Sequence, residues 1–260
     1  MKIVVCVKYV PDATADRQFN PDNTVDRVSV DGLLSELDEY AVEEALKIRE
    51  ADGESEIVIL TVGPDEARAA ILKSLQMGSD AGVHVVDDAI HGSDAVGTSL
   101  VLAKAIEQQR PDLVICGMAS TDGSMSVVPA MVAERLGLPQ VTFGSQVSVD
   151  GATVRARRDG DAATEIVEAT TPLLLSVTDQ ANEPRYPSFK GIMAAKKKPV
   201  ETLSLSDLEV SPDEVGLEAS WTTVAGSTAR PPRSAGTIVT DDGGSGADQL
   251  VEFLAGQKFI

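Results

Sequence analysis

Residues 56–77 read EIVILTVGPDEARAAILKSLQM, which is a strand, a tight turn and a helix in direct succession. The run from Glu56 to Val62 is rich in β-branched residues and leucine, as is typical of a parallel strand buried on both faces. Gly63 and Pro64 predict the turn, and apolar residues then recur at helical spacing as far as Met77. The apolar stripe consists of Ala67, Ile71, Leu72 and Leu75. The stretch therefore predicts one strand and one helix that packs on a sheet.

The same alternation continues on both sides of this stretch. Strands are predicted at residues 2–8, 82–86 and 112–116, and helices at residues 38–49, 94–109 and 128–136. In the helix at 38–49, the stripe of Ala41, Val42, Ala45, Leu46 and Ile48 is expected to face the sheet, with Glu39, Glu43, Glu44 and Lys47 in solvent. Alternation of this kind predicts an α/β fold with a doubly wound, mostly parallel, Rossmann-like sheet of the adenine-nucleotide-binding type.

The character of the chain changes after Pro139. Four further strands are predicted at residues 141–149, 152–158, 165–169 and 173–177, with turns at Asp150-Gly151 and Gly160-Asp161, and they are expected to add antiparallel strands to the main sheet. Periodicity weakens from about Thr202, and residues 225–246 have none, which indicates an extended arm ending in a short helix at 248–254. We therefore expect a nucleotide-binding domain over residues 1–200, strand-rich from about 140, and a C-terminal arm over residues 201–260.

Composition narrows the functional classes. The formal net charge is -19, from 41 acidic and 22 basic residues, and such a charge repels a phosphate backbone, so general binding of nucleic acid is not expected. One segment is an exception, because residues 184–200 carry five basic residues and no acid. No apolar run is long enough to cross a membrane, and a second charge stands at Lys8, so we expect a cytoplasmic protein that is not membrane-inserted.

Two cysteines and two histidines are the side chains of this sequence that most often carry redox or metal chemistry. Cys6 and Cys116 lie far apart within apolar runs and form neither a CxxC pair nor a disulfide framework, so burial in the core is expected for both. His84 and His91 have no cysteine or acidic cluster at ligand spacing. No metal site is therefore predicted.

A ligand site is predicted at the carboxyl ends of the first and fourth strands. Ligands of parallel α/β sheets bind where chain connections diverge, which here places residues 6–12 and 116–126 together. Residues 117–126 read GMASTDGSMS and combine small residues, hydroxyls and the start of a helix, which are the parts of a phosphate cradle. A loop of this composition is also a common surface connection, and the residues alone leave that alternative open.

No catalytic machinery can be assembled from the sequence. Neither histidine has a serine or cysteine partner in a recognisable motif, and the chain has no GxGxxG after its first strand and no GxxxxGK[ST]. The residues alone thus indicate a nucleotide-binding α/β domain without a catalytic residue.

A long motif adds a resemblance to a family. Residues 182–198 read NEPRYPSFKGIMAAKKK, which resembles the signature of electron-transfer flavoprotein beta subunits, including the FixA type. Four shorter segments resemble the family in the same order, so the resemblance spans essentially the whole chain. They are VKYVPD at 7–12, EYAVEEA at 39–45, SLQMGSD at 74–80 and PDLVICG at 111–117.

The resemblance implies a heterodimer in which an alpha subunit holds most of the redox FAD. The beta subunit then buries AMP or, in bifurcating members, a second FAD. The residues implied in nucleotide binding are Cys6, Val62, Gly63, Gly117, Thr121, Asp122, Gly123, Ser124, Met125 and Ser126. The chain has DGSMSV at 122–127 where members often carry a D-x-D-T-G-Q-like run, but the hydroxyls of Ser124 and Ser126 can still hold a phosphate. AMP is expected, with a second FAD as the alternative.

The resemblance also implies two surfaces for partners. The recognition loop for dehydrogenases comprises Arg185, Tyr186, Phe189, Lys190, Ile192 and Met193. Phe189 is expected as the apolar anchor, with Arg185 and Lys190 steering toward acidic partners, and the alternative is a Phe189 that packs in the core. Asp12 and its neighbours resemble the family's loop that approaches the flavin. Asp159 stands where the family has an acid that can pair with an alpha-subunit arginine. Both residues are equally compatible with solvated surface charges.

Two functions from different classes follow. The first is an electron-carrier subunit that accepts electrons from acyl-CoA and related dehydrogenases, as in fatty acid oxidation, and passes them to a membrane quinone oxidoreductase and the respiratory chain. The second is a stand-alone enzyme that uses an adenine nucleotide. Such an enzyme needs a phosphate-activating motif or metal-holding acids, and only Asp122 is available. The first function is the one we expect.

Overall fold

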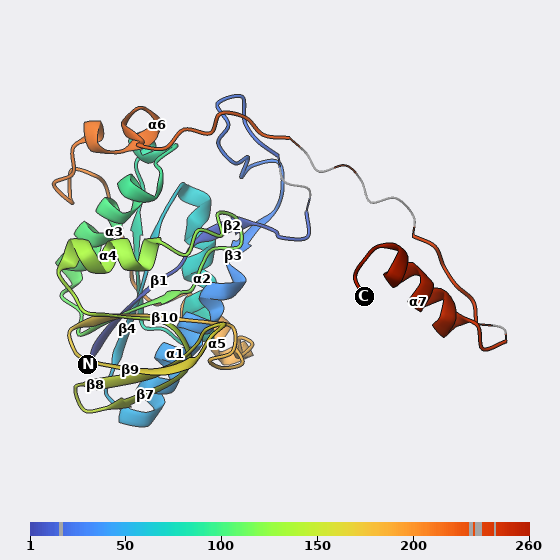
Figure 1. Ribbon diagram of the computed structural model, residues 1–260. Helices are drawn as coiled ribbons and strands as arrows, with labels where there is room; N and C mark the ends of the chain where they lie inside the picture. Colours follow the sequence, from blue (N-terminus) through green and yellow to red (C-terminus); the bar gives the residue numbers. More distant parts are fainter. Residues whose placement is uncertain (16–17, 229–230, 232–235, 242) are drawn as a thin grey trace. The chain divides into compact units, whose positions relative to one another are not determined.

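The computed structural model describes residues 1–260 with the exception of 16–17, 229–230, 232–235 and 242 (Figure 1). The chain divides into two compact units, Met1–Ala225 and Gly226–Ile260.

The first unit is built on a nine-stranded sheet with the order β11-β5-β4-β1-β6-β10-β7-β8-β9. All neighbouring strands from β11 to β7 pair in parallel, whereas β8 and β9 add an antiparallel meander at one edge. The strands of this sheet are β1 (Lys2–Cys6), β4 (Glu56–Val62), β5 (Ala81–Val85), β6 (Leu113–Gly117), β7 (Gln140–Asp150), β8 (Thr153–Asp159), β9 (Thr164–Thr170), β10 (Leu173–Val177) and β11 (Val200–Leu203). A separate antiparallel pair joins β2 (Tyr9–Pro11) to β3 (Gly32–Leu34).

Helices cover both faces of the sheet. One core contains buried residues of α1 and α2 packed on Ile3 and Ile57, and the other contains residues of α3 and α4 packed on Val4 and Val58. Because successive side chains of a strand point to opposite faces, these two cores lie on the two sides of the sheet. The helices are α1 (Glu36–Asp52), α2 (Arg68–Met77), α3 (Ala95–Gln109), α4 (Val128–Leu136), α5 (Phe189–Ala195), α6 (Gly216–Ala219) and α7 (Gly246–Gly256), with 3₁₀ turns at Asp65–Ala67, Asp88–Ile90 and Pro212–Glu214. The predicted doubly wound α/β fold is confirmed.

The strand order locates the switch point of the sheet. From β1 the chain moves to β4 and β5 on one side, and then returns to place β6 on the other side of β1. The connections that leave β1 and β6 therefore diverge at their carboxyl ends, which is where ligands of such sheets bind.

Two predictions about helix faces are wrong. Glu43 and Glu44 are only 5% and 2% exposed, because the segment that follows β10 packs on this face of α1 and supplies partners for both carboxylates. Leu72, predicted to pack on the sheet, is 42% exposed on α2. An amphipathic pattern reports the average face of a helix and does not anticipate a segment that covers its polar side.

The region after residue 200 contains structure that periodicity did not show. β11 pairs with β5 at the edge of the main sheet, and four apolar residues beyond it join the core formed by α3 and α4. They are Leu205, Leu208, Val210 and Val215. The first compact unit therefore runs to Ala225. In the second unit, the predicted short helix is observed as α7, and none of its residues is buried.

Candidate functional site

A cavity of about 280 Å³ opens at the switch point, at the carboxyl ends of β1, β4 and β6. It brings together the strand ends, the loop at 117–126 and the first turns of α3 and α4. We call it the edge cavity, and its lining consists of Cys6, Val7, Lys8, Asp38, Val62, Ser93, Asp94, Ala95, Thr98, Leu102, Cys116, Gly117, Ala119, Ser120, Gly123, Met125, Ser126, Val128 and Pro129.

Close packing of β6 against α1 forms one wall of the edge cavity. A Cβ on Gly117 would lie 2.5 Å from Oδ1 of Asp38 and 2.7 Å from the carbonyl oxygen of Leu37, so only glycine fits at this strand end. Cys6 and Cys116 are paired in register on the neighbouring strands. The hydrogen bond with Cys6, followed by burial, raises the pKa of the Cys116 thiol well above its usual value. This thiol is therefore a packing group and not a nucleophile.

Asp38 is a buried acid at the cavity wall. Its Oδ2 accepts a hydrogen bond from the backbone N–H of Lys8 at 2.8 Å, which fixes the turn after β1 on the start of α1. Burial raises the pKa of Asp38 to about 7, although the hydrogen bond and charge of Lys8 act in the opposite direction. The carboxyl group thus titrates close to neutral pH.

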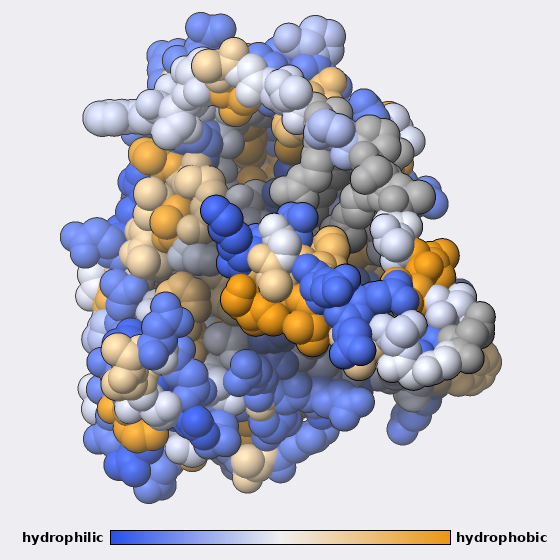
Figure 2. All heavy atoms as spheres, turned by 45° about the vertical axis from the view of Figure 1, so that its right-hand side comes forward, coloured by the Kyte–Doolittle hydropathy of each residue, from blue (hydrophilic) through white to orange (hydrophobic). Residues whose placement is uncertain are grey.

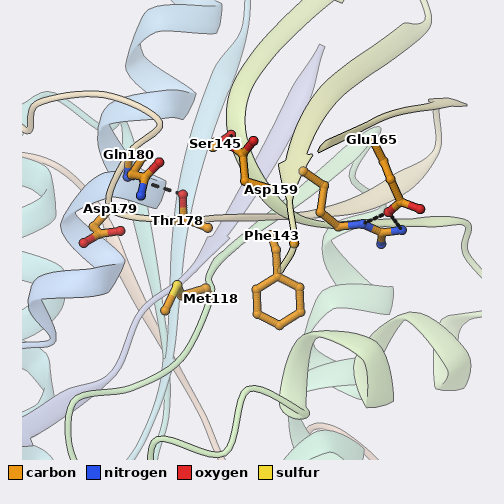
Figure 3. Close-up of a pocket in the computed structure, with 10 residues that line it drawn as sticks. Met118, Phe143, Ser145, Asp159, Glu165, Thr178, Asp179 and Gln180 are labelled. Atoms are coloured by element: carbon orange, nitrogen blue, oxygen red, sulfur yellow. Dashed lines mark hydrogen bonds and ion pairs between the residues drawn. The ribbon is translucent and has the colours of Figure 1, made fainter. Parts of the chain in front are cut away.

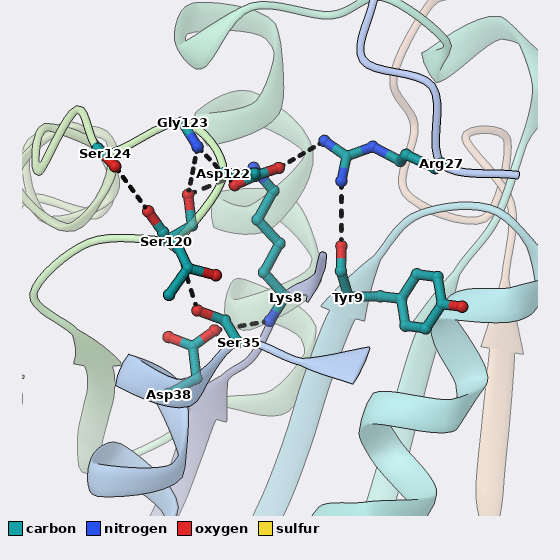
Figure 4. A network of polar contacts seen from close by, with 10 residues as sticks. Lys8, Tyr9, Arg27, Ser35, Asp38, Ser120, Asp122, Gly123 and Ser124 are labelled. Atoms are coloured by element: carbon teal, nitrogen blue, oxygen red, sulfur yellow. Dashed lines mark hydrogen bonds and ion pairs between the residues drawn. The ribbon is translucent and has the colours of Figure 1, made fainter. Parts of the chain in front are cut away.

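Asp122 holds the 117–126 loop in place. Its side chain is 3% exposed and lies between two cations, with Lys8 Nζ at 2.9 Å and an Arg27 guanidinium nitrogen at 2.6 Å (Figure 4). It also accepts the backbone N–H of Gly123 at 2.7 Å. Burial acts to raise the pKa of Asp122, but Lys8, Ser120 and Arg27 outweigh it and hold this pKa well below its ordinary value. Asp122 is therefore ionised at neutral pH and joins the loop to segments about a hundred residues earlier.

The end of the 117–126 loop has an unusual backbone. Ser124 and Ser126 have φ angles of 52° and 57°, in the left-handed region that non-glycine residues seldom adopt. Each such residue costs about 1–3 kcal/mol and is typical of ligand-binding segments. α4 begins two residues later, and its N-cap, Val127, provides no side-chain hydrogen bond. The start of α4, with Val128 and Pro129 in the cavity lining, therefore has no capping side chain.

The start of α3 is different, because Asp94 already caps it. The Asp94 carboxylate accepts the N–H groups of Val96 at 2.9 Å and Gly97 at 3.1 Å. It also accepts the N–H groups of Trp221 at 2.9 Å and Thr222 at 3.0 Å. An anionic ligand is therefore disfavoured at α3 and favoured on the side of Lys8 and α4.

The edge cavity contains part of the predicted nucleotide set. Cys6, Val62, Gly117, Gly123, Met125 and Ser126 line it, whereas Gly63, Thr121, Asp122 and Ser124 are not in its lining. The lining residues Lys8 and Ser120 lie within the predicted ranges 6–12 and 116–126 but were not singled out there, whereas Asp38 and Asp94 were missed. Both acids come from helix starts that only the folded chain brings to the cavity.

A second cavity, of about 490 Å³, lies beside the antiparallel strands and contains Asp159 (Figure 3). Asp159 accepts hydrogen bonds from Ser145 at 2.6 Å, Arg157 at 2.9 Å and Thr164 at 2.8 Å, and these partners lower its pKa. Asp12 lines neither cavity and instead accepts the N–H and O–H groups of Thr14 at 2.8 and 2.7 Å. The lining residues of the second cavity are Met118, Phe143, Ser145, Arg158, Asp159, Gly160, Glu165, Thr178, Asp179 and Gln180.

The motif at residues 182–198, here called the recognition segment, is clamped at both ends. Arg185 forms ion pairs with Glu43 at 2.8 Å and Glu50 at 2.5 Å, both on α1. At the other end, the ammonium group of Lys198 donates to three carbonyl groups at the end of α2, including that of Leu75 at 3.0 Å. In between, a Cβ on Gly191 would lie 2.4 Å from the carbonyl oxygen of Gln76, so α5 approaches α2 as closely as the backbone allows. The segment is thus held rigidly on the domain.

Between these clamps the apolar side chains point outward. Phe189 is 81% exposed and Tyr186 is 92% exposed, with Ile192 and Met193 also exposed on α5. The alternative that Phe189 packs in the core is therefore wrong. Arg185 is engaged within the chain, and the exposed basic residues of the segment are Lys190, Lys196 and Lys197. Elsewhere on the protein, apolar areas likewise interrupt a mostly hydrophilic surface (Figure 2).

The residues that the structure describes contain no cluster of three or more histidine, cysteine or acidic side chains arranged to hold a metal ion. Nor do they include a helix with the length and hydrophobicity needed to cross a membrane.

Comparisons with known proteins agree with the geometry. A parallel sheet wound on both faces, with a small cavity at its switch point, defines an α/β protein of the Rossmann-like class. A family model described as the Electron transfer flavoprotein domain matches residues 22–208. The chain is 48% identical to the electron transfer flavoprotein subunit beta of Mycobacterium tuberculosis strain H37Rv over 264 residues, which cover 99% of both chains.

More distant relatives also align over the whole chain. The electron transfer flavoprotein subunit beta of Thermoanaerobacterium thermosaccharolyticum is 36% identical, and the acryloyl-CoA reductase electron transfer subunit gamma of Anaerotignum propionicum is 32% identical, each with 100% of both chains covered. The chain therefore belongs to the electron transfer flavoprotein family, among its beta subunits. It is an electron-carrier subunit and not an enzyme in its own right, as the sequence predicted.

Proposed function

We propose that the chain pairs with an alpha subunit that holds FAD, accepts electrons from acyl-CoA and related dehydrogenases, and passes them to a membrane quinone oxidoreductase and the respiratory chain. The observation that carries the proposal is the edge cavity of a family member, together with an exposed recognition segment on the same domain. The FAD supplies the redox chemistry, and this chain supplies the scaffold, a nucleotide site and a docking surface. Its placement in the cytoplasm stays a prediction from the sequence.

We assign AMP to the edge cavity. At about 280 Å³ the cavity lies at the lower end of the range for small-molecule sites, which suits a mononucleotide better than a dinucleotide. Val62, Leu102 and Pro129 offer apolar surface to a base, while Ser126, in the lining beside the start of α4, is placed for a phosphate. A second FAD in this cavity, as in a bifurcating carrier, is the alternative.

We assign the recognition segment to contact with dehydrogenases. An exposed aromatic side chain that is held by a rigid segment loses little conformational entropy when it is buried by a partner. Lys190 and its basic neighbours favour an acidic partner surface. The relative from Anaerotignum propionicum is named as part of an acryloyl-CoA reductase, which supports a partner that acts on acyl-CoA.

We assign the second unit, and the expected arm over residues 201–260 more widely, to contact with the alpha subunit. α7 carries Leu250, Val251 and Phe253, each more than half exposed, and such a face needs a partner surface. Asp12 and Asp159 are assigned to the side that meets the alpha subunit and its flavin. Both carboxyl groups are ionised at neutral pH, as pairing with an arginine requires, and hydrogen bonds lower their pKa values further below the ordinary value of an aspartate.

The test is to express the chain with its alpha subunit, purify the complex, and quantify the nucleotides released per heterodimer. One FAD and one AMP support the carrier as proposed, and two FAD favour the bifurcating type. If no complex forms and the isolated chain turns over ATP, the protein is instead a stand-alone nucleotide-using enzyme.

A further inference from the structure

Lys8 is the only lysine or arginine side chain in the lining of the edge cavity, as far as the described residues show. Its ammonium group contacts Asp122 at 2.9 Å and Ser120 at 3.5 Å, and the side chain is still 43% exposed. An ammonium group has three donors, so one remains for a ligand. By itself, however, the pair with Asp122 would cancel the positive charge of Lys8.

Arg27 changes this balance. Its guanidinium group approaches the other oxygen of the same carboxylate at 2.6 Å, and it also donates to the carbonyl oxygen of Tyr9 at 3.3 Å. Among the described residues, two cations thus share one buried carboxylate, so Asp122 alone does not cancel the positive charge of Lys8. Since Arg27 is not in the lining, Lys8 is the group through which a ligand meets this charge.

The other charged groups of the cavity do not oppose this assignment. Asp38 is bonded to the backbone N–H of Lys8, and Asp94 is saturated by N–H groups of α3 and of residues 221–222. Both acids therefore keep an anion away from their own sides and leave the side of Lys8, Gly123 and Ser126 for it.

We propose that Lys8 is the cation that binds the phosphate group of the nucleotide, and that Arg27 makes it available by neutralising Asp122. This inference rests on the proposed function of the edge cavity and adds to it two residues, one of which acts without touching the ligand. The ligand class is a nucleoside monophosphate, and the two residues confer preference for it over the uncharged nucleoside.

The test compares AMP with adenosine, which differs only by the phosphate. The complex with the alpha subunit is stripped of bound nucleotide, and both ligands are titrated by calorimetry into wild type, Lys8→Gln, Lys8→Arg, Arg27→Gln and, as a matched control, Arg155→Gln. Arg155 also pairs with an acid, Glu168, but lies on the exposed meander. Adenosine binding reports whether each variant is folded at the cavity.

We expect Lys8→Gln and Arg27→Gln to lower the preference for AMP over adenosine by about ten-fold or more, since a charge-assisted hydrogen bond is lost or weakened. Lys8→Arg restores most of the preference, Arg155→Gln leaves it unchanged, and adenosine affinity stays within about two-fold throughout. If Lys8→Gln and Arg27→Gln bind both ligands with the wild-type preference, the assignment of the phosphate cation is wrong. If wild type itself binds neither ligand, the nucleotide site of the proposed function fails, and this inference fails with it.

Discussion

Replacing Arg185 by methionine tests whether the recognition segment is held by its ion pairs. The carboxylate of Glu43 is 7% exposed, so removal of the guanidinium leaves a buried and uncompensated charge. Breaking such a pair costs about 3–5 kcal/mol, and because the Arg185 side chain is 34% exposed we expect a value near the lower end, about 3 kcal/mol. The pair with Glu50 adds little, since that carboxylate is 56% exposed.

A double-mutant cycle separates the buried charge from lost packing. Glu43→Gln in the Arg185→Met background removes the charge that is left behind, so the double variant is expected to be more stable than Arg185→Met alone. The free energy of unfolding is measured by urea denaturation of the complex at one fixed protein concentration. Arg155→Met, which breaks an exposed pair, serves as the control with an expected loss below about 1 kcal/mol. A loss below 1 kcal/mol for Arg185→Met, or a double variant no more stable than the single one, would refute this reasoning.

Three further predictions concern the surface, the cavity wall and pH. Phe189→Ala is expected to change the free energy of unfolding by less than about 0.5 kcal/mol but to weaken binding to a partner dehydrogenase by about 2 kcal/mol or more. The replacement of another exposed side chain, Ile166→Ala, is the control. Unchanged steady-state rates of electron acceptance at limiting carrier concentration would contradict this prediction. Gly117→Ala is expected to lower the free energy of unfolding by about 1–3 kcal/mol, because the added Cβ meets Asp38 and Leu37. Gly160→Ala, whose Cβ would make an ordinary contact, is expected to stay near wild type. Equal losses for the two variants would argue against the close approach of β6 to α1. Burial raises the pKa of Asp38 in the folded state to about 7, so the folded protein binds more protons than the unfolded chain between about pH 4 and 7. The contribution of Asp38 to the free energy of unfolding therefore falls as the pH rises through that window, by on the order of 4 kcal/mol. Asp38→Asn is expected to flatten the plot of unfolding free energy against pH, and an unchanged slope would show that Asp38 does not titrate there.

The parts of the fold that sequence predicted well are those that local periodicity determines. The strand at Glu56–Val62 and the helix at Val128–Leu136 have the predicted bounds, because each is a continuous apolar run or stripe with glycine or proline close to its ends. β11 was missed because it is only four residues long and lies at an edge of the sheet, so its sequence shows no clear alternation. α5 was missed because its apolar residues face solvent, so no core-facing stripe marks it.

The sequence predicted where a cavity would lie, but only part of its lining. The topology rule needs only the order of strands, and the edge cavity lies where that rule points, at the ends of β1 and β6. The ion pairs of Asp122 join residues 8, 27 and 122, and Arg185, which pairs with Glu43, lies 142 positions further along the chain. Contacts between distant segments are set by the packed structure and leave no local signal, so the charged part of the site could be seen only in the folded chain.

The exposed apolar face of α7 should affect how long the chain survives in the cell without its partner subunit. A helix with no buried residue and with Leu250, Val251 and Phe253 in water resembles the unfolded segments that chaperones bind and proteases cut. We expect a chain made in excess of its partner to be removed, and a chain whose α7 is covered to persist. We therefore expect the exposure of this helix to limit the amount of the chain to the amount of its partner.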